Sequence, residues 1–364
     1  MRAPVAIGLA AVAALGVSLS AQQGKHLNPM INLLSEGKAI FGLGMPCGPV
    51  RGGGPGGNRG GAQGGGAGAA AAGTVTIPPA TPPIGPTPPP AAPPKTKAEC
   101  AQDVVAHPES DWFFTATMER GVDTGAPNLI ELQEALAALG PVSKGPNPRL
   151  LMPINSKAPN ISRADMAADP ANYVTNLSKQ LNAGVSSIAF VEVDSAQELE
   201  LGIAALRFKA NGGTRPDEVG NAPKYWGLSE AEYRKKADVW PLNPNGEIVV
   251  WAIVETHEGL ANLDEIAQVK GLSVIAAGAG TLGGVFSTTN AEGRRVRDDA
   301  AWEGAIQKIL ATCKKYKKPC AYPVNENDIE TRYSQGFNVG ILQSFNDMAF
   351  RAVAKGRAVS GRDK

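Results

Sequence analysis

Three carboxylates stand where buried strands of this sequence are expected to end. Glu255 directly follows the apolar run 248–254, and Glu192 and Glu119 lie near the ends of two earlier apolar runs. Carboxylates in such places serve as metal ligands or as general acids and bases. A nearby arginine can instead stabilise a strand-end glutamate. Glu119 and its neighbour Arg120 can equally form an ion pair at the rim of a site. We therefore treat Glu119 and Arg120 as candidate catalytic residues, and Glu255 and Glu192 as candidate metal ligands.

A glycine-rich stretch supplies a second candidate. Residues 278–284 read GAGTLGG and follow another apolar run. Successive backbone N–H groups in a glycine-rich turn can bind an anion. We take Gly278, Gly280, Thr281 and Leu282 as candidate substrate-binding residues. By contrast, His257 is interpreted as a histidine of the rim.

The elements that must position these residues alternate along the chain. Eight strands are expected, each paired with a helix, and alternation of this kind predicts a parallel sheet. A closed (β/α)8 TIM barrel fits eight pairs in about 290 residues. An open doubly wound sheet is the alternative, but no glycine-rich dinucleotide fingerprint follows any strand. The expected strands are 39–43, 112–116, 150–154, 187–193, 248–254, 272–277, 319–323 and 338–342, and residues 208–246 are expected to form a polar loop.

Composition divides the chain into five parts. Residues 46–97 hold 14 glycines and 13 prolines, a composition that cannot bury enough apolar surface to fold. We expect a disordered insertion after strand one, with residues 21–45 beginning the barrel and 98–356 completing it. Residues 1–20 resemble a signal peptide, with a basic Arg2, an apolar stretch and small residues before Ala21. Residues 357–364 form a basic tail.

Export and redox state follow from the N-terminus and the cysteines. A signal peptide predicts a periplasmic or secreted protein without a stable membrane span after cleavage; a short membrane anchor is the alternative. An exported chain with four cysteines permits disulfides. We expect Cys47 to pair with Cys100 across the insertion, and Cys313 and Cys320 are a second candidate pair. A net charge of +1 predicts no nucleic-acid partner.

Four motifs together resemble the HpcH/HpaI aldolase/citrate lyase family. The stretch 254–266 (VETHEGLANLDEI) is similar to its strand-five signature, and 114–121 (FTATMERG) to a strand-two motif ending in Met-Glu-His-Gly. Residues 181–184 (LNAG) resemble a segment before strand four, and 225–227 (YWG) an aromatic loop. The similarity covers about 29–45 and 98–356, and the family is often oligomeric.

The resemblance implies a carbon–carbon lyase that forms or cleaves a bond next to a 2-oxo acid such as pyruvate. In the family, Mg²⁺ or Mn²⁺ lies between a strand-five Glu, matched by Glu255, and an Asp, whose position holds Thr281. The family's His and Arg positions hold Arg120 and Leu151, and a Gln position holds Ile253. Glu192 and Glu119 are the substitutes available as ligands.

Three functions remain as expectations. The first is a divergent carbon–carbon lyase with weak or altered activity. The second is a degenerate barrel that binds a small carboxylate, and the third is a cell-envelope role through the insertion. We also expect Glu255, Glu119 and Glu192 to converge on one pocket with Arg120 and Thr281 on its wall. There, Arg120 would replace the metal as a fixed positive charge.

Overall fold

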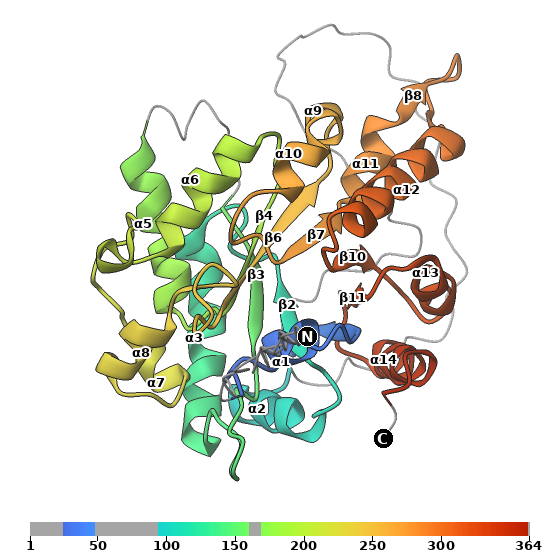
Figure 1. Cartoon of the computed structure of the whole chain (residues 1–364). Coiled ribbons are helices and arrows are strands. Elements are labelled where there is room, and N and C mark those ends of the chain that lie inside the picture. Colours follow the sequence, from blue (N-terminus) through green and yellow to red (C-terminus); the bar gives the residue numbers. More distant parts are fainter. Residues whose placement is uncertain (1–24, 48–93, 160–168, 363–364) are drawn as a thin grey trace, which may run out of the picture.

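A closed parallel barrel forms the centre of the computed structural model, which describes residues 25–47, 94–159 and 169–362 (Figure 1). Eight strands run in the order β4-β3-β2-β1-β11-β10-β7-β6, and pairing of β4 with β6 closes the ring. The predicted TIM barrel is therefore confirmed. Its strands are β1 (Ile40–Gly44), β2 (Trp112–Thr115), β3 (Ile154–Lys157), β4 (Ser187–Phe190), β6 (Ile248–Val254), β7 (Val274–Ala277), β10 (Cys320–Pro323) and β11 (Val339–Ile341).

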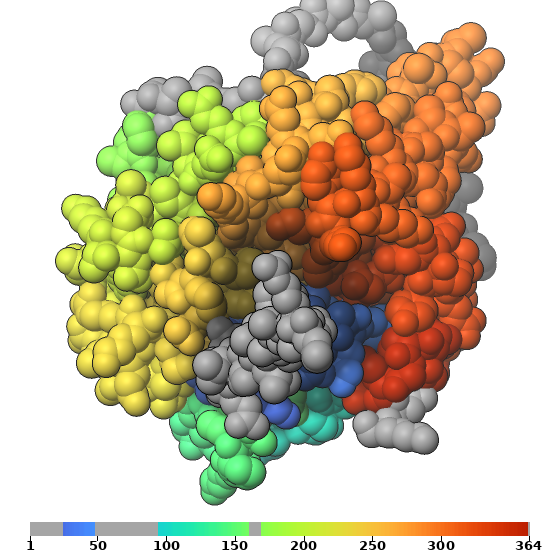
Figure 2. Space-filling model, viewed as in Figure 1, coloured from blue at the N-terminus to red at the C-terminus, as the bar shows by residue number. Residues whose placement is uncertain are grey.

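Helices lie around this barrel, and most of them pack on the outward-facing side chains of the strands (Figure 1). They are α1 (Pro29–Ser35), α2 (Lys97–Ala106), α3 (Val122–Leu139), α5 (Pro170–Asn182), α6 (Ala196–Leu206), α7 (Ala222–Tyr225), α8 (Glu230–Lys236), α9 (His257–Ala261), α10 (Leu263–Ala267), α11 (Ala279–Val285), α12 (Asp299–Lys315), α13 (Ile329–Gln335) and α14 (Asp347–Val359). A short β5 (Val239–Trp240) pairs with β6, and β8 (Ser287–Thr289) forms a hairpin with β9 (Arg295–Arg297). Figure 2 shows the first described residues beside the last helix.

Side chains fill the barrel interior, so it does not form an open channel. Trp112 and Trp251 meet edge to face inside it, with ring centroids 5.0 Å apart. Gly42 makes room for them, because a Cβ there would lie 2.1 Å from the Trp112 indole. A site for a ligand must therefore lie above this layer, at the carboxyl ends of the strands.

Helix α1 closes the opposite, amino-terminal end of the barrel. Met30, Ile31 and Leu34 of this helix belong to the same buried cluster as Trp112 and Trp251. Asn28 caps the helix, and its side chain accepts a hydrogen bond from the Met30 N–H. With this end closed by apolar packing, the carboxyl-terminal mouth is where the strand-end carboxylates gather.

Two disulfides link the described residues. Cys47 pairs with Cys100, with a Cα–Cα separation of 6.0 Å, and Cys313 pairs with Cys320 at 5.7 Å. The predicted Cys47–Cys100 pairing is thus confirmed. The predicted signal peptide at 1–20 and most of the predicted insertion at 46–97 lie outside the described residues. Residues from the predicted basic tail continue α14 to Val359.

Strand three was predicted in the wrong place. The prediction chose the apolar residues 150–154, but the strand is β3, Ile154–Lys157, and Leu150 instead forms an isolated bridge to Val142. Polar residues are tolerated in β3 because they bond inside the barrel: the Asn155 amide donates to the Ser187 hydroxyl at 2.8 Å. This shift moves a lysine to the mouth of the barrel.

Two other segments also differ from the sequence-based expectation. Residues 208–246, expected as a polar loop, contain α7, α8 and β5, because their aromatic side chains are buried; Trp226 is 1% exposed. The glycine-rich stretch 278–284 was read as an anion-binding turn but forms most of helix α11, anchored by the buried Leu282. No helix within the described ranges is long and apolar enough to cross a membrane.

Candidate active site

Glu255 is the most deeply placed carboxylate at the mouth of the barrel. It directly follows β6 and is only 4% exposed. Gly278, at the end of the neighbouring strand β7, makes room for it: a Cβ there would lie 2.3 Å from the Glu255 Cβ and 2.5 Å from Oε2. The glycine therefore matters because it lets a buried carboxylate stand between two strand ends.

Burial raises the pKa of the Glu255 carboxyl above its ordinary value, because the charged form loses hydration. Hydrogen bonding from Thr281, the charge of Lys157 and the Glu192 backbone N–H each lower it again, while the negative charge of Glu192 raises it. The net direction is upward. A carboxyl with a raised pKa can exchange a proton with a substrate closer to neutral pH than an ordinary glutamate can.

Lys157 is the cation of this site, and none of the sequence motifs pointed to it. It is the last residue of β3, in register with Ala189 of the interior cluster. Its Nζ lies 2.9 Å from Glu119 Oε1, and the two side chains are 21% and 22% exposed. The pair is thus accessible at the mouth, and its ammonium is close enough to Glu255 to influence that carboxyl's pKa.

The signal that could have revealed Lys157 is the tetrapeptide INSK at 154–157, in which three of the four residues are polar. Its alternation places Asn155 and Lys157 on one face of a strand. A search for apolar runs selects the preceding Leu150 and Leu151 and not a strand of this kind. The family arginine position at Leu151, inferred from that misplaced strand, lies before β3 rather than at its carboxyl end.

Glu192 contributes its backbone to the site. It has a left-handed φ of 49°, unusual for a residue other than glycine, and its N–H donates to Glu255 Oε1 at 3.1 Å. Its side chain is exposed. The structure therefore brings Glu255, Glu119 and Glu192 to one end of the barrel. Lys157 forms an ion pair with Glu119, and its charge also lowers the pKa of Glu255.

The remaining candidates differ in whether they interact with these charged groups. Arg120 is exposed, and within the described part of the chain no ion pair joins it to Glu255, Glu119 or Glu192. Gly280 is exposed, and Leu282 is buried in the core, so its side chain cannot meet a ligand. Thr281 is exposed, and its side chain hydrogen-bonds to the Glu255 carboxylate. His257 is on the surface, its ring packed edge to face on Phe286 at 5.1 Å.

The residues present do not fit the divalent metal that the family resemblance implies. At the two positions where the family has metal ligands, only Glu255 is a carboxylate. The positive charge of the Lys157 ammonium already lowers the pKa of that carboxyl. Among the described residues, no group of three or more His, Cys, Asp or Glu side chains could hold a metal ion. Mg²⁺ and Mn²⁺ favour several oxygen ligands, and a nearby cation opposes their binding.

A barrel of this kind, with a buried strand-end carboxylate beside an ion pair, has the architecture of an enzyme active site. The family model of the HpcH/HpaI aldolase/citrate lyases matches residues 167–327, which confirms the predicted family over that part of the chain. The match includes β4, β6 and β7 and therefore Glu192, Glu255 and Thr281. No curated protein matches the sequence significantly.

Two solved structures of this family were compared with the chain, and one of them shares its fold. An HpcH/HpaI aldolase/citrate lyase family protein from Burkholderia cenocepacia is 16% identical with a TM-score of 0.51, over 73% of this chain and 91% of that chain. An HpcH/HpaI aldolase from Desulfitobacterium hafniense is 13% identical, with a TM-score of 0.47, over 72% and 89%. The first of these supports the barrel, and neither identifies a substrate.

Proposed function

We propose that this chain is a carbon–carbon lyase that acts on a small 2-oxo acid at the carboxyl-terminal mouth of its barrel. The observation that carries the proposal is Glu255, a buried carboxyl with a raised pKa at the family's strand-five position, within electrostatic reach of Lys157, which pairs with Glu119. The family match supports the reaction class. The cation supports the substrate class, because it attracts the carboxylate that every 2-oxo acid carries.

The proposed cleavage needs one base and one positive charge. The Glu255 carboxylate takes the proton from the hydroxyl group of the substrate's aldol carbon. The carbon–oxygen double bond of the aldehyde forms as the carbon–carbon bond breaks, and the electron pair passes to the 2-oxo acid as an enolate. Protonation of the enolate carbon by the Glu255 carboxyl then yields the 2-oxo acid and restores the base. Because its pKa is raised, the Glu255 carboxylate is a stronger base in the first step than an ordinary glutamate, and in the second step it returns the proton that it took.

A binding protein for small carboxylates is the second candidate. It is favoured by one observation, the replacement of the family's Asp and His positions by Thr281 and Arg120. In that case Lys157 would hold a carboxylate, and Glu255 would transfer no proton. The two candidates differ in whether a bound 2-oxo acid is enolised.

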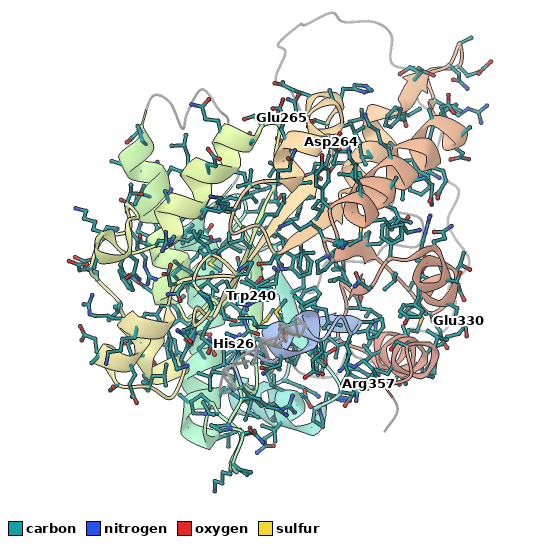
Figure 3. All side chains as sticks on the ribbon, in the orientation of Figure 1. His26, Trp240, Asp264, Glu265, Glu330 and Arg357 are labelled. Atoms are coloured by element: carbon teal, nitrogen blue, oxygen red, sulfur yellow. A yellow bond between two sulfur atoms is a disulfide. The ribbon has the colours of Figure 1, made fainter. Side chains whose placement is uncertain are left out.

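Proton exchange at the methyl group of pyruvate tests the lyase proposal. In D₂O, the wild-type protein should replace the methyl protons with deuterium, which proton NMR follows directly. Glu255→Gln should slow this exchange at least ~100-fold, since a general base typically contributes 10²–10⁴-fold. Glu265→Gln is the matched control, because Glu265 is an exposed residue of helix α10 (Figure 3).

Calorimetry with pyruvate separates the outcomes. Binding without exchange in the wild-type protein would favour the binding protein over the lyase. Neither binding nor exchange, across pyruvate and longer 2-oxo acids, would remove 2-oxo acids as ligands of this site.

We also propose that the protein is exported. The basic and apolar N-terminus and the two cysteine pairs support this, because disulfides persist in oxidising compartments. Mass spectrometry of the mature protein should find an N-terminus at Ala21; an intact Met1 in the cell envelope would point to an anchor instead.

A further inference from the structure

We propose that the Lys157 ammonium supplies the positive charge that a divalent metal provides in related barrels, so that this site binds and enolises its substrate without a metal. The inference rests on the proposed function and goes beyond it, because it assigns a catalytic residue that the sequence motifs do not include. It also replaces the earlier expectation that Arg120 fills this role.

The position of Lys157 supports this assignment. It is the last residue of β3 and shares the barrel-facing register of Ala189, so it stands at the mouth above the packed interior. Its side chain is 21% exposed, which leaves the ammonium accessible to a small ligand. Arg120, by contrast, is exposed and has no ion pair with the three glutamates in the described part of the molecule.

The donor capacity of the ammonium matches a 2-oxo acid. A lysine ammonium has three N–H donors, and the hydrogen bond to Glu119 at 2.9 Å uses one of them. The other two N–H groups are enough to serve one carboxylate oxygen and the keto oxygen of a substrate. These are the oxygens on which negative charge lies in the acid and develops in the enolate, so the same ammonium stabilises both.

The charge of the surrounding carboxylates also favours a monovalent cation. Replacement of the family's Asp by Thr281 removes one anionic ligand, which weakens a divalent ion more than an ammonium. The Thr281 hydroxyl still interacts with Glu255. Glu119 then balances Lys157, and Glu255 is left to exchange protons instead of holding a metal.

A covalent role for the lysine is the competing possibility. To form an imine with a 2-oxo acid, the amine must first be neutral, attack the keto carbon and release water. In the structure the Lys157 Nζ is instead engaged in an ion pair with the Glu119 carboxylate at 2.9 Å. The geometry therefore favours the ammonium as a fixed charge over the amine as a nucleophile.

Pyruvate binding and methyl-proton exchange, each measured with and without EDTA, test the proposal. We expect EDTA to change neither in the wild-type protein. Lys157→Met should weaken exchange by about 100-fold or more, the usual cost of losing one group that stabilises a developing oxyanion. Lys157→Arg should bind pyruvate within about tenfold of wild type, because it preserves the charge. Lys315→Met, which removes an exposed lysine paired with Asp264 at 2.7 Å, should change neither measurement.

Metal binding gives an independent readout. Electron paramagnetic resonance should detect no tight Mn²⁺ binding to the wild-type protein, and Thr281→Asp combined with Lys157→Met should increase Mn²⁺ affinity. Tight Mn²⁺ binding to wild type, or loss of exchange in EDTA, would overturn the proposal. So would unchanged exchange in a folded Lys157→Met variant, with circular dichroism as the check of folding.

Borohydride distinguishes the covalent role. Reduction of the protein with pyruvate should leave its mass unchanged, and a stable adduct on Lys157 would replace the fixed-charge assignment with an imine. Failure of the proposed function looks different: the wild-type protein would then show no exchange with any 2-oxo acid, with or without EDTA or added Mn²⁺.

Discussion

Two glutamates flank the same barrel strand. The surroundings of one suit a structural role, and those of the other suit a functional role. Glu247 directly precedes β6 and Glu255 directly follows it. Both are almost completely buried, at 0% and 4% exposed. Glu247 faces the closed amino-terminal end of the barrel, and Glu255 faces its mouth. The difference lies in the number and kind of partners that each carboxylate has.

Glu247 is surrounded by donors that hold it in place. Its Oε1 accepts from the Leu27 N–H at 3.0 Å and its Oε2 from the Asn28 N–H at 2.9 Å. Lys236 and His26 approach it at 3.2 and 3.5 Å, and Figure 3 shows His26 beside α1. This carboxylate therefore fastens the segment that leads into α1 to the start of β6. Glu255 accepts one backbone N–H, and its carboxyl has a raised pKa, so it is less well compensated and more available to a substrate.

The largest effect expected from this comparison is on stability at the closed end. Glu247→Ala should lower the free energy of unfolding by about 3 kcal/mol, because it leaves two buried backbone N–H groups without acceptors, each costing about 1–3 kcal/mol. Urea unfolding followed by circular dichroism measures this. Glu247→Gln keeps an acceptor oxygen and should cost less. An Ala variant as stable as Glu265→Ala would show that Glu247 does not fasten α1.

The opposite effect is expected at the mouth. Glu255→Gln should raise the free energy of unfolding at neutral pH by roughly 1 kcal/mol, a gain typical of replacing a strained functional group. The amide oxygen still accepts the Glu192 N–H, and the variant no longer buries a charge. A gain of stability with a loss of exchange would identify Glu255 as a group retained for function.

The pH dependence of this gain follows from the direction of the pKa shift. Because the folded-state pKa of Glu255 is raised, ionisation penalises the native state. The penalty is absent below the unfolded-state pKa and is complete above the folded-state pKa. The advantage of Glu255→Gln should therefore be present at neutral pH and disappear on acidification through that interval. An advantage that stays constant on acidification would contradict a raised pKa.

The sequence predicted the scaffold better than the site. Glu255 could be found because a long apolar strand ends at it, and strand burial is what an apolar run reports. Lys157 could not be found in that way, since β3 is held by bonds such as Asn155 to Ser187 that hydrophobicity does not register. Arg120 was predicted as the cation because it stands at the family's His position in a chain that also lacks the family's Asp ligand. Adjacent residues on an extended or turning chain point in different directions, and only Glu119 reaches Lys157.

The role of Gly278 also could not be predicted from the sequence. Gly278 was proposed for its backbone N–H, but its role in the structure is to leave space for the Glu255 side chain. A sequence shows that a glycine lacks a Cβ without showing what occupies the space that is freed. Close approaches between neighbouring strand ends depend on barrel register, which the motifs did not specify.

The smallest effect concerns the two charges that flank Glu255. Lys157 lowers the pKa of the Glu255 carboxyl, and Glu192 raises it. Glu192→Gln should therefore lower this pKa and Lys157→Met should raise it, and we expect the larger change from the lysine. Carbon-13 NMR of the glutamate carboxyls, titrated in each variant, measures both shifts directly and does not depend on activity.

The Glu192 variant is informative because the residue acts in two ways. Its backbone N–H donates to Glu255 at 3.1 Å and remains in Glu192→Gln, so only the effect of the side-chain charge is removed. Since that side chain is exposed, water and salt screen its influence, and the shift should shrink as ionic strength rises. The lysine, only 21% exposed and paired with Glu119, should be screened less. Shifts of the same sign in the two variants would mean that Glu255 responds to a change in backbone position rather than to these charges. Opposite signs, with the larger change from Lys157, would place the charge that governs Glu255 on the lysine.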